Sequence, residues 1–471
     1  MSAQNTDFSR EVTAAMQNSN KPTSTYESST YERNHFTLLS ILRGTDGSRM
    51  PERDEPQLTL RLERIFLDRA TGARVPFEGE AGLEALLKAL SQTWQVFETQ
   101  SFEDHLMGIY GRMSLGNGYL VPLVISLGAG GQLVCKAGPC PSVESLLAVV
   151  EALDRQLHVE ATKLGASYDL VAEGYNPAVS SPLDVALIPR ARWTILNAHL
   201  GSTGRYGRDV MRCACSTGVS ISHSGDHDAI QAFRLATALA PLLCFLTDNV
   251  RSFRGAGARR TQRMVRSVMW EDFDRTRCGM VPGTFDSNFT FETYLNWVES
   301  KQPILFEADD GTVLSTGKVV LSDFMRTRRL SRNEAAHLLH NVYPFARLTE
   351  HTLQISQADS LRPRMAAGYL TFLKGLLRNE RSVAMALSAI GSIREADVAD
   401  AMRSLRKFGW GATVYGQPVT TLVDKLVYLS RSSLVDPADL RILSGITELW
   451  EVRMVPRDAF VHQETKEVRG W

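Results

Sequence analysis

The chain has 471 residues, of which 44% are hydrophobic and 22% are charged, an ordinary composition for a soluble globular protein. Its 52 Lys and Arg residues balance 52 Asp and Glu residues, so no net charge attracts it to nucleic acid or to an anionic membrane. The length predicts two or three domains, or one large elaborated domain.

The first 34 residues are rich in Ser, Thr, Asn and Gln and contain few large apolar side chains. This composition predicts a flexible polar tail over 1–34 and lacks the basic and apolar regions of a signal peptide. The longest apolar run, 236–246, is too short to cross a bilayer and is expected to be a buried helix. We therefore expect a cytoplasmic protein with no membrane or nucleic-acid partner. The oligomeric state is left open.

Two strands are predicted next, over 35–42 and 58–68. Apolar and polar residues alternate in the second strand, which places Arg61 and Glu63 together on one face, opposite the leucines. Helical spacing of apolar residues follows over 80–97.

A strand, a Gly-rich turn and a second strand are predicted over 119–139. Ser142 has the side chain of an N-cap for the helix that follows it. The stretch 167–199 is irregular and rich in proline, whereas 210–223 has the small and β-branched residues of a strand. A long helix is predicted over 226–249.

The Arg-rich run 251–266 contains few aromatic residues, which favours a solvated loop over a contact with a polyanion. After Leu330 the spacing of apolar residues predicts helices throughout the C-terminal third. Together these elements predict an α+β fold, with a mainly antiparallel sheet early in the chain and a helical C-terminal third.

The six cysteines are too sparse for a disulfide framework. Their closest pairs, Cys135 with Cys140 and Cys213 with Cys215, lack the C-x2-C spacing of a zinc site. Buried free thiols are the favoured interpretation. The run HSGDHD (223–228) offers His and Asp side chains for a metal, but a helix start is favoured because Ser and Asp are typical there.

The run from Arg263 to Tyr294 is the most informative part of the chain. It gathers cations, carboxylates and an indole: Arg266, Trp270, Arg275, Arg277, Glu271, Asp272, Asp274 and Asp286. Arginine presents a planar fork of donors that matches carboxylate or phosphate oxygens two at a time. The run therefore indicates a site for a charged small molecule, and a solvated loop of surface ion pairs is the alternative.

Four segments, taken in order, resemble the glutamate–cysteine ligase family of the plant and proteobacterial type. They are SLGAGGQLVCKAGP (126–139), MRCACSTGVSIS with DAIQAFRLATALAP (211–241), MVRSVMWEDFDRTRCGMVPGTFDSNFTFETYLNWV (264–298), and LSRNEAAHLLHNVYPFARLTEHTLQISQADS (330–360). The third segment is the most specific, because order, spacing and residue types agree there.

The resemblance implies a fold similar to glutamine synthetase, with a curved antiparallel sheet that forms a funnel. It implies an ATP-dependent carboxylate–amine ligase that uses Mg²⁺ and joins an amino acid to an amine or thiol-bearing substrate through a γ-glutamyl or related amide bond. A polar tail (1–34), a ligase-like domain (35–330) and a helical region packed on it (331–471) are then expected.

The same resemblance implies roles for residues in the third segment. Arg266 would act in catalysis as an anion clamp and would also contact ATP. Trp270 would wall the substrate pocket, or else be a core aromatic residue. Arg277 would hold a substrate carboxylate or the following turn, or else form a salt bridge to Asp272 or Asp274.

Further roles are implied elsewhere in the chain. Gly131 and Gln132 match a Gly-Gly-Gln turn at the mouth of the funnel and, with Ser220, would bind substrate. Asp359 would contact the cofactor, and Glu63 would be a metal ligand, because a carboxylate on the first strand faces the metal ions in the family.

The sequence also departs from the family pattern. Gly128 stands where the family has a Glu, Gly218 and Ser220 stand where it has polar ligands, and Glu63 is alone on its strand. Because Mg²⁺ prefers several hard oxygen ligands, these departures raise an alternative. It is a catalytically altered homologue without the usual Mg-ATP site, which binds a small molecule or peptide or performs different chemistry on an amino acid or thiol.

Overall fold

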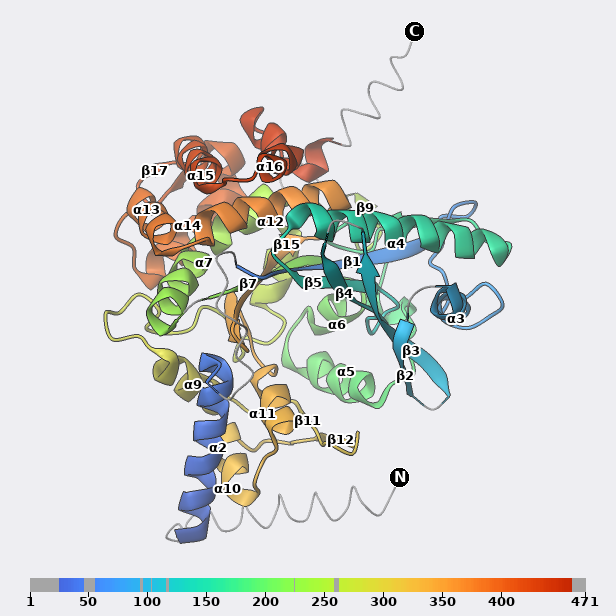
Figure 1. The fold of residues 1–471 in the computed structure, drawn as a ribbon, viewed down its shortest axis with the longest axis horizontal. Helices are drawn as coiled ribbons and strands as arrows, with labels where there is room; N and C mark the ends of the chain where they lie inside the picture. The colour runs from blue at the N-terminus through green and yellow to red at the C-terminus, as the bar shows by residue number, and fades with distance from the viewer. Residues whose placement is uncertain are drawn as a thin grey trace.

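The computed structural model describes residues 25–45, 56–93, 96–102, 104–115, 118–223, 225–257 and 262–459. Within them, a nine-stranded antiparallel sheet forms the centre of the fold (Figure 1). Eight strands follow the order β14-β15-β7-β1-β5-β4-β3-β2, and β6 pairs with the second half of β1. The bounds are β1 Leu58–Asp68, β2 Val96–Phe102, β3 His105–Ser114, β4 Leu120–Leu127, β5 Leu133–Cys140, β6 Tyr168–Val171, β7 Ser216–Ser222, β14 Ala346–Thr349 and β15 Thr352–Asp359.

Helices account for most of the remaining regular structure, and the α+β class predicted from the sequence is confirmed. Their bounds are α2 Thr25–Arg43, α3 Leu83–Thr93, α4 Val143–Lys163, α5 Ala191–Thr203, α6 Gly207–Arg212, α7 Asp226–Leu246, α8 Val265–Glu271, α9 Phe291–Glu299, α10 Leu321–Thr327, α11 Arg332–Leu339, α12 Pro363–Leu377, α13 Glu380–Ile390, α14 Glu395–Phe408, α15 Val419–Ser433 and α16 Pro437–Glu451. Short ladders join β8 Ser252–Phe253 with β9 Ala256–Gly257, β10 Cys278–Gly279 with β13 Tyr343–Pro344, β11 Leu305–Glu307 with β12 Val313–Ser315, and β16 Thr413–Val414 with β17 Gln417–Pro418.

Strand β1 has the alternation that the sequence predicts. Leu60 and Leu62 are fully buried, whereas Arg61 and Glu63 are partly exposed on the opposite face. Helices α4, α7 and α12 pack against strands of the sheet and bury the leucine face, as Figure 1 shows. The charged face of β1 is thereby left for a pocket.

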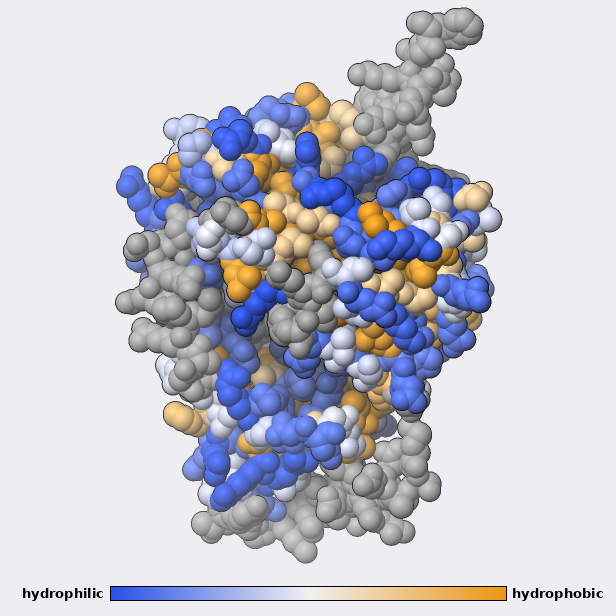
Figure 2. All heavy atoms as spheres, turned by 45° about the vertical axis from the view of Figure 1, so that its right-hand side comes forward, coloured by the Kyte–Doolittle hydropathy of each residue, from blue (hydrophilic) through white to orange (hydrophobic). Residues whose placement is uncertain are grey.

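Among the described helices, α7 alone is long and apolar enough to cross a membrane by length and composition, and 83% of its most apolar window is buried inside the protein. The prediction of a buried helix over 236–246 is confirmed. Hydrophobic residues on the face shown in Figure 2 occur in small groups among hydrophilic ones.

The strand predicted over 35–42 is wrong, because those residues belong to the helix α2. Its buried face carries Thr30 and Asn34 one turn apart, followed by Leu38 and Leu42. Since half of this stripe is polar, the helical period was hidden, and the β-branched and aromatic residues dominated the prediction. Of the predicted tail, 1–24 lie outside the described residues, and 25–34 are helical.

Two further predictions are corrected. The stretch 167–199 is not irregular throughout, since α5 begins two residues after Pro189, a position that commonly precedes a helix start. The predicted strand 210–223 begins as the end of α6, and only Ser216–Ser222 is a strand. Cys213 and Cys215 therefore precede β7, and neither lies on it. All six cysteines are free thiols, and all but Cys278 are buried.

The sheet takes strands from both sides of residue 330. Strands β14 and β15 lie beyond that residue, yet they form one edge of the sheet beside β7. The helices after Leu361 pack together around α12, as the predicted helical region requires. The division of the chain at 330 stays a prediction.

Asn34 joins α2 to the loop after α10. Its amide donates to the carbonyls of Met325 (2.7 Å) and Arg328 (2.8 Å) and accepts from the amide of Leu330 (3.0 Å) in a fully buried position. Asn34→Ala is expected to lower the free energy of unfolding by about 2–4 kcal/mol, because buried backbone groups lose their partners. Urea denaturation measures this. The exposed Glu32→Ala on the same helix should change it by less than about 0.5 kcal/mol, and equal effects would contradict the assignment.

Candidate functional site

A pocket of about 720 Å³ lies against the charged face of the sheet. Strands β1, β4, β5, β7, β14 and β15 supply its floor. Helices α5, α6 and α8 and the β13 segment supply the opposite wall, so the pocket brings together residues almost 300 positions apart. Pockets of this size hold cofactors and substrates in other proteins.

The described residues that line the pocket carry far more positive than negative charge. Seven are cationic: Arg61, Lys136, Arg190, Arg192, Arg266, Arg275 and Arg347. Two are acidic, Glu63 and Glu271, and Glu271 is paired with Arg406 at 2.6 Å. An anionic ligand is the chemistry that this surface favours.

Register places two of these cations side by side on the floor of the pocket. Arg61 on β1 lies directly opposite Lys136 on β5 and Gly218 on β7. A Cβ atom at Gly218 would lie 3.5 Å from the Cβ of Arg61 and 3.6 Å from the Ser356 hydroxyl, in ordinary contact. The glycine thus keeps the space beside Arg61 open.

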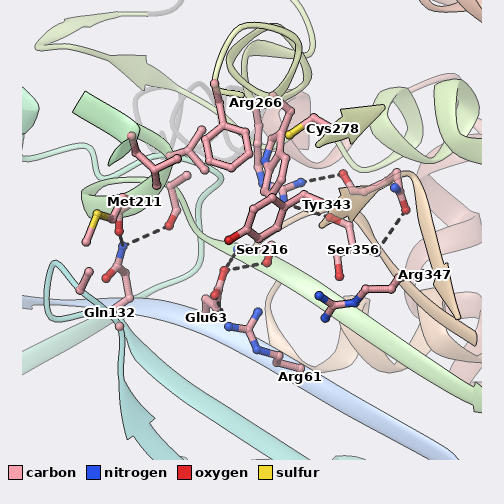
Figure 3. A pocket seen from close by; sticks show the side chains of 18 of the residues that line it. Arg61, Glu63, Gln132, Met211, Ser216, Arg266, Cys278, Tyr343, Arg347 and Ser356 are labelled. Atoms are coloured by element: carbon pink, nitrogen blue, oxygen red, sulfur yellow. Dashed lines mark hydrogen bonds and ion pairs between the residues drawn. The ribbon is translucent and has the colours of Figure 1, made fainter. Parts of the chain in front are cut away.

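Glu63 is held by three donors. Its Oε1 accepts from Arg61 Nη2 at 2.5 Å, and its Oε2 accepts from the amide (2.8 Å) and hydroxyl (2.6 Å) of Ser216 (Figure 3). Burial, the largest single influence, raises the pKa of Glu63, but Arg61, Ser216 and Arg266 together bring it below its usual value. The carboxylate is therefore ionised, and both of its oxygens are engaged.

The donor set does not fit a cluster of Mg²⁺ ions. Magnesium requires near-octahedral oxygen ligands and usually one or two free carboxylates. In the part of the chain that the structure describes, no group of three or more His, Cys, Asp or Glu side chains could hold a metal. Glu63, the predicted ligand, is already bound to a guanidinium. The alternative of a metal site in HSGDHD (223–228) gains no support either, because α7 begins there at Asp226. Ser224 lies outside the described residues.

Arg266 lines the pocket, but most of its donors are used by the protein. It is the second residue of the short helix α8 and donates to the carbonyls of Ser356 (2.9 Å), Gln357 (2.9 Å) and Ala358 (3.3 Å). These carbonyls belong to an irregularity in the pairing of β15 with β7. Of its nitrogens only the buried Nε lacks a partner. Its role as anion clamp stays a prediction.

Trp270 stands on the same helix and lines the pocket. Its ring packs edge to face on Phe273 (4.9 Å between centroids) and on Tyr343 (5.9 Å), and the Arg266 guanidinium lies 5.4 Å from its centre. The indole Nε1 is buried without a hydrogen-bond partner. The ring is therefore both part of an aromatic cluster and a donor beside the cavity.

The Gly-Gly-Gln turn is tightly packed. Gln132 Oε1 accepts from the Gly130 amide (2.9 Å), and its Nε2 donates to the carbonyls of Met211 (3.2 Å) and Ala214 (3.3 Å). Gly131 has φ +81, where only glycine is unstrained. Gln132 borders the pocket, whereas Gly131 does not belong to its lining. Their roles in substrate binding stay predictions.

Arg277 lies away from the pocket lining in a buried ion pair. Its Nη1 is 2.5 Å from Asp274 Oδ2, and its Nε donates to the Gln302 carbonyl at 2.8 Å. Asp274 also contacts His199 at 2.9 Å. Burial raises the pKa of Asp274, but His199, Thr276 and Arg277 bring it to about 2. The salt bridge to Asp274, weighed as an alternative in the sequence, is present.

Ser220 and Asp359 are also outside the pocket lining. Ser220 lies in β7 between Thr59 and Gln354. Asp359 ends β15 and accepts from the Asn249 amide at 2.7 Å in a buried position. Burial first, and the carboxylate of Asp248 second, raise the pKa of Asp359 to about 7.

Sequence analysis missed the cations Arg61, Lys136, Arg190 and Arg347 as site residues. Arg61 and Lys136 lie on predicted strands, at positions that alternate with buried apolar residues. This alternation could have placed both charges on the pocket face of the sheet. Their juxtaposition depends on the pairing of β1 with β5, which the sequence did not define. Arg190 precedes a helix that was not predicted.

The fold is an antiparallel sheet with a cationic pocket on one face, a surface that favours anions. The model of glutamate-cysteine ligase family 2 matches residues 62–412. The chain belongs to this family, and the resemblance found in its four segments is confirmed.

Curated relatives are chloroplastic glutamate–cysteine ligases. Those of Nicotiana tabacum and Arabidopsis thaliana are each 26% identical over 266 residues, which is 55% of this chain and 50% of theirs. The chain thus spans about half the length of the curated relatives it matches. The predicted cytoplasmic location is contradicted, because these relatives are named as chloroplastic.

A solved structure of glutamate–cysteine ligase from Francisella tularensis in complex with AMP is also similar. It is 9% identical, with a TM-score of 0.49, and the match covers 88% of this chain and 85% of that one.

Arg277 and Arg275 form a matched pair of arginines in one loop. Arg277 pairs with Asp274 in the interior, whereas Arg275 pairs with Asp272 at 3.1 Å and is 73% exposed. Arg277→Met should lower the free energy of unfolding by about 3 kcal/mol, because it leaves a buried carboxylate without its cation. Arg275→Met should change it by less than about 0.5 kcal/mol. Denaturant unfolding of both variants would refute the structural role of Arg277 if they were equally stable.

The buried carboxylates Asp359 and Asp248 predict a pH dependence of stability. Burial raises both pKa values, to about 7 for Asp359, where the Asp248 carboxylate adds to the shift, and to about 6 for Asp248, where Asp458 adds to it. The folded state therefore binds these protons more tightly than the unfolded chain. The stabilisation that these two protons give the folded state is complete below about pH 4. It is lost as the pH rises through 6 to 7.

Asp359→Asn removes one of these titrating groups. We expect it to flatten the curve of unfolding free energy between pH 4 and 7 by roughly 2 kcal/mol. Urea denaturation at several pH values measures the curve, and the exposed Asp169→Asn should leave it unchanged. An identical slope in wild type and Asp359→Asn would show that Asp359 keeps an ordinary pKa.

Proposed function

We propose that this protein is an ATP-dependent carboxylate–amine ligase that acts on small amino-acid substrates. Membership of the glutamate–cysteine ligase family supports this function, and the observation that carries it is the pocket with seven lining cations. Phosphate and carboxylate groups are the anions that such a reaction brings together. The finer proposal is that glutamate supplies the carboxylate and that the product is a γ-glutamyl amide.

The proposed reaction has two steps. A carboxylate oxygen attacks the terminal phosphorus of ATP, which releases ADP and forms an acyl phosphate. The amine nitrogen then attacks the acyl carbon, the carbon–oxygen bond breaks, and phosphate leaves with the proton lost from nitrogen. Charge concentrates on phosphate and carboxylate oxygens in both steps, and fixed cations stabilise it.

The chain's own residues supply two things that this reaction requires, which are positive charge near the reacting oxygens and the exclusion of water. Arg61, Lys136 and Arg347 on the floor of the pocket lie where oxygen charge would be neutralised. Trp270, Phe273 and Tyr343 on the opposite wall are apolar groups that exclude water from an acyl phosphate. Because the carboxylate set does not fit clustered Mg²⁺, no step is assigned to a metal here. The alternative is a homologue without ligase activity. The test below supports that alternative if no amide forms.

The test is amide formation by the purified chain. We expect phosphate release from ATP that depends on glutamate and on one member of an amine panel led by cysteine, with an equal amount of amide product by mass spectrometry. Glu63→Ala should reduce the rate at least tenfold, on the order expected for a lost charged contact, because Arg61 and Ser216 lose their shared partner. The exposed Glu78→Ala is the matched control. Absence of amide product for every pair would reject the proposal.

A further inference from the structure

We propose that Arg61, Lys136 and Arg347, here called the cationic floor, bind a multiply charged oxyanion by direct contacts without a divalent cation. The inference rests on the proposed function in one respect: the expected oxyanion is the phosphate chain of ATP. It goes further, because it assigns to side chains the charge neutralisation that Mg²⁺ provides in phosphoryl transfer elsewhere.

The first observation is that the cationic floor is under electrostatic stress. Arg61 and Lys136 are cross-strand neighbours, and like charges directly opposite one another destabilise a sheet. Figure 3 shows Arg347 beside Ser356, with its guanidinium turned toward Arg61 and Glu63. An anion bound between cations held this close would relieve their repulsion.

The second observation is that the internal carboxylates do not neutralise this floor. Arg61 shares Glu63, which also accepts two bonds from Ser216. Among the residues that the structure describes, Arg347 donates only to neutral acceptors, the Gln354 side chain (2.9 Å from Nε) and the Val342 carbonyl. Lys136 has no ion pair within the described residues.

One acidic group acts on the floor from the end of β14. Glu350 influences Lys136 and lies 3.5 Å from Arg332. Burial and Arg61 together lower the pKa of Lys136, against the weaker effect of Glu350. Burial also lowers the pKa of Arg347, and Arg61 adds to the shift. The net field at the floor is positive, and the floor lacks enough internal anions to balance it.

The third observation concerns unpaired groups around the cavity. Four buried side-chain atoms of lining residues have no hydrogen-bond partner in the described part of the chain, and all four are N–H donors: Arg192 Nε, Trp193 Nε1, Arg266 Nε and Trp270 Nε1. Buried polar groups are normally paired, so donors left open beside a cavity indicate a ligand rich in acceptors. Two of them belong to indole rings, which also offer flat surfaces to an organic group attached to the anion.

The phosphate chain of a nucleotide matches these features best. It carries several oxygens for the arginine and lysine donors, and its base has a flat face for the aromatic wall. Mg²⁺ bound to the phosphates would cancel part of their charge and occupy the oxygens that the floor requires. Mg²⁺ should therefore weaken the binding of ATP to this floor. In an enzyme that holds Mg²⁺ with carboxylates, the metal strengthens the binding of ATP.

The test is isothermal titration of the full chain with ATP, either in excess EDTA or in excess Mg²⁺. We expect ATP to bind about tenfold more tightly in EDTA, because the full charge of the phosphates then reaches the floor. Inorganic tripolyphosphate should compete, and AMP should bind weakly. If glutarate binds and tripolyphosphate does not, the same metal-free site belongs to the carboxylate substrate. Binding of ATP only with Mg²⁺, or no binding of either anion in EDTA, would overturn the proposal.

Lys136→Gln provides a readout that a structural role would not give. It should weaken the binding of ATP in EDTA about tenfold, since one charge-assisted contact is lost. It should also raise the melting temperature of the free protein by about 1 °C, because the repulsion with Arg61 is removed. The exposed Arg69→Gln changes net charge equally and should alter affinity less than about twofold. Unchanged affinity in Lys136→Gln would reject Lys136 as a ligand contact.

The binding and turnover experiments separate the two proposals. Metal-free binding without amide formation would retain the cationic floor and reject the ligase. Amide formation accompanied by binding of Mg-ATP alone would retain the ligase and reject the cationic floor.

Discussion

The ion pair between Arg61 and Glu63 neutralises the carboxylate that the described strands contribute to the pocket. Both side chains come from one strand, two residues apart, so the pleat of β1 fixes them on the same face. Glu63 is the one carboxylate that the described strands contribute to the pocket lining, and it is used to hold Arg61 and the start of β7. Every other charge that the sheet contributes there is positive. The chemistry open to the pocket follows from this imbalance.

The arginines of this protein divide into two groups by what their donors reach. Arg266 and Arg277 point at backbone carbonyls and at Asp274, so their charge orders β15 and the loop before α9. Among the described residues, Arg61 reaches the Glu63 carboxylate, which Ser216 shares, and Arg347 reaches neutral acceptors. The first group makes the pocket rigid, and the second leaves it attractive to anions. Residue type alone does not distinguish the groups, because a guanidinium serves both purposes equally well.

Much of the fold was accessible from local sequence. The alternation in β1, the turn between β4 and β5, and the Ser142 cap of α4 are set by neighbours within a few residues, and all were predicted correctly. The helix α2 was missed because its buried face includes Asn34, whose partners Met325 and Leu330 are about 300 residues away. A polar residue on the buried face of a helix is predicted to be solvent-exposed unless its distant hydrogen-bond partner is known.

The sequence by itself determined the family and the α+β class. Order and spacing of short motifs carry that information without three-dimensional contacts. Only the tertiary structure decided which charges remain for a ligand. Strand register set Arg61 beside Lys136, and a bulge in β15 drew Arg266 onto its carbonyls. Register and long-range hydrogen bonds depend on the pairing of distant segments, so no local pattern specifies them.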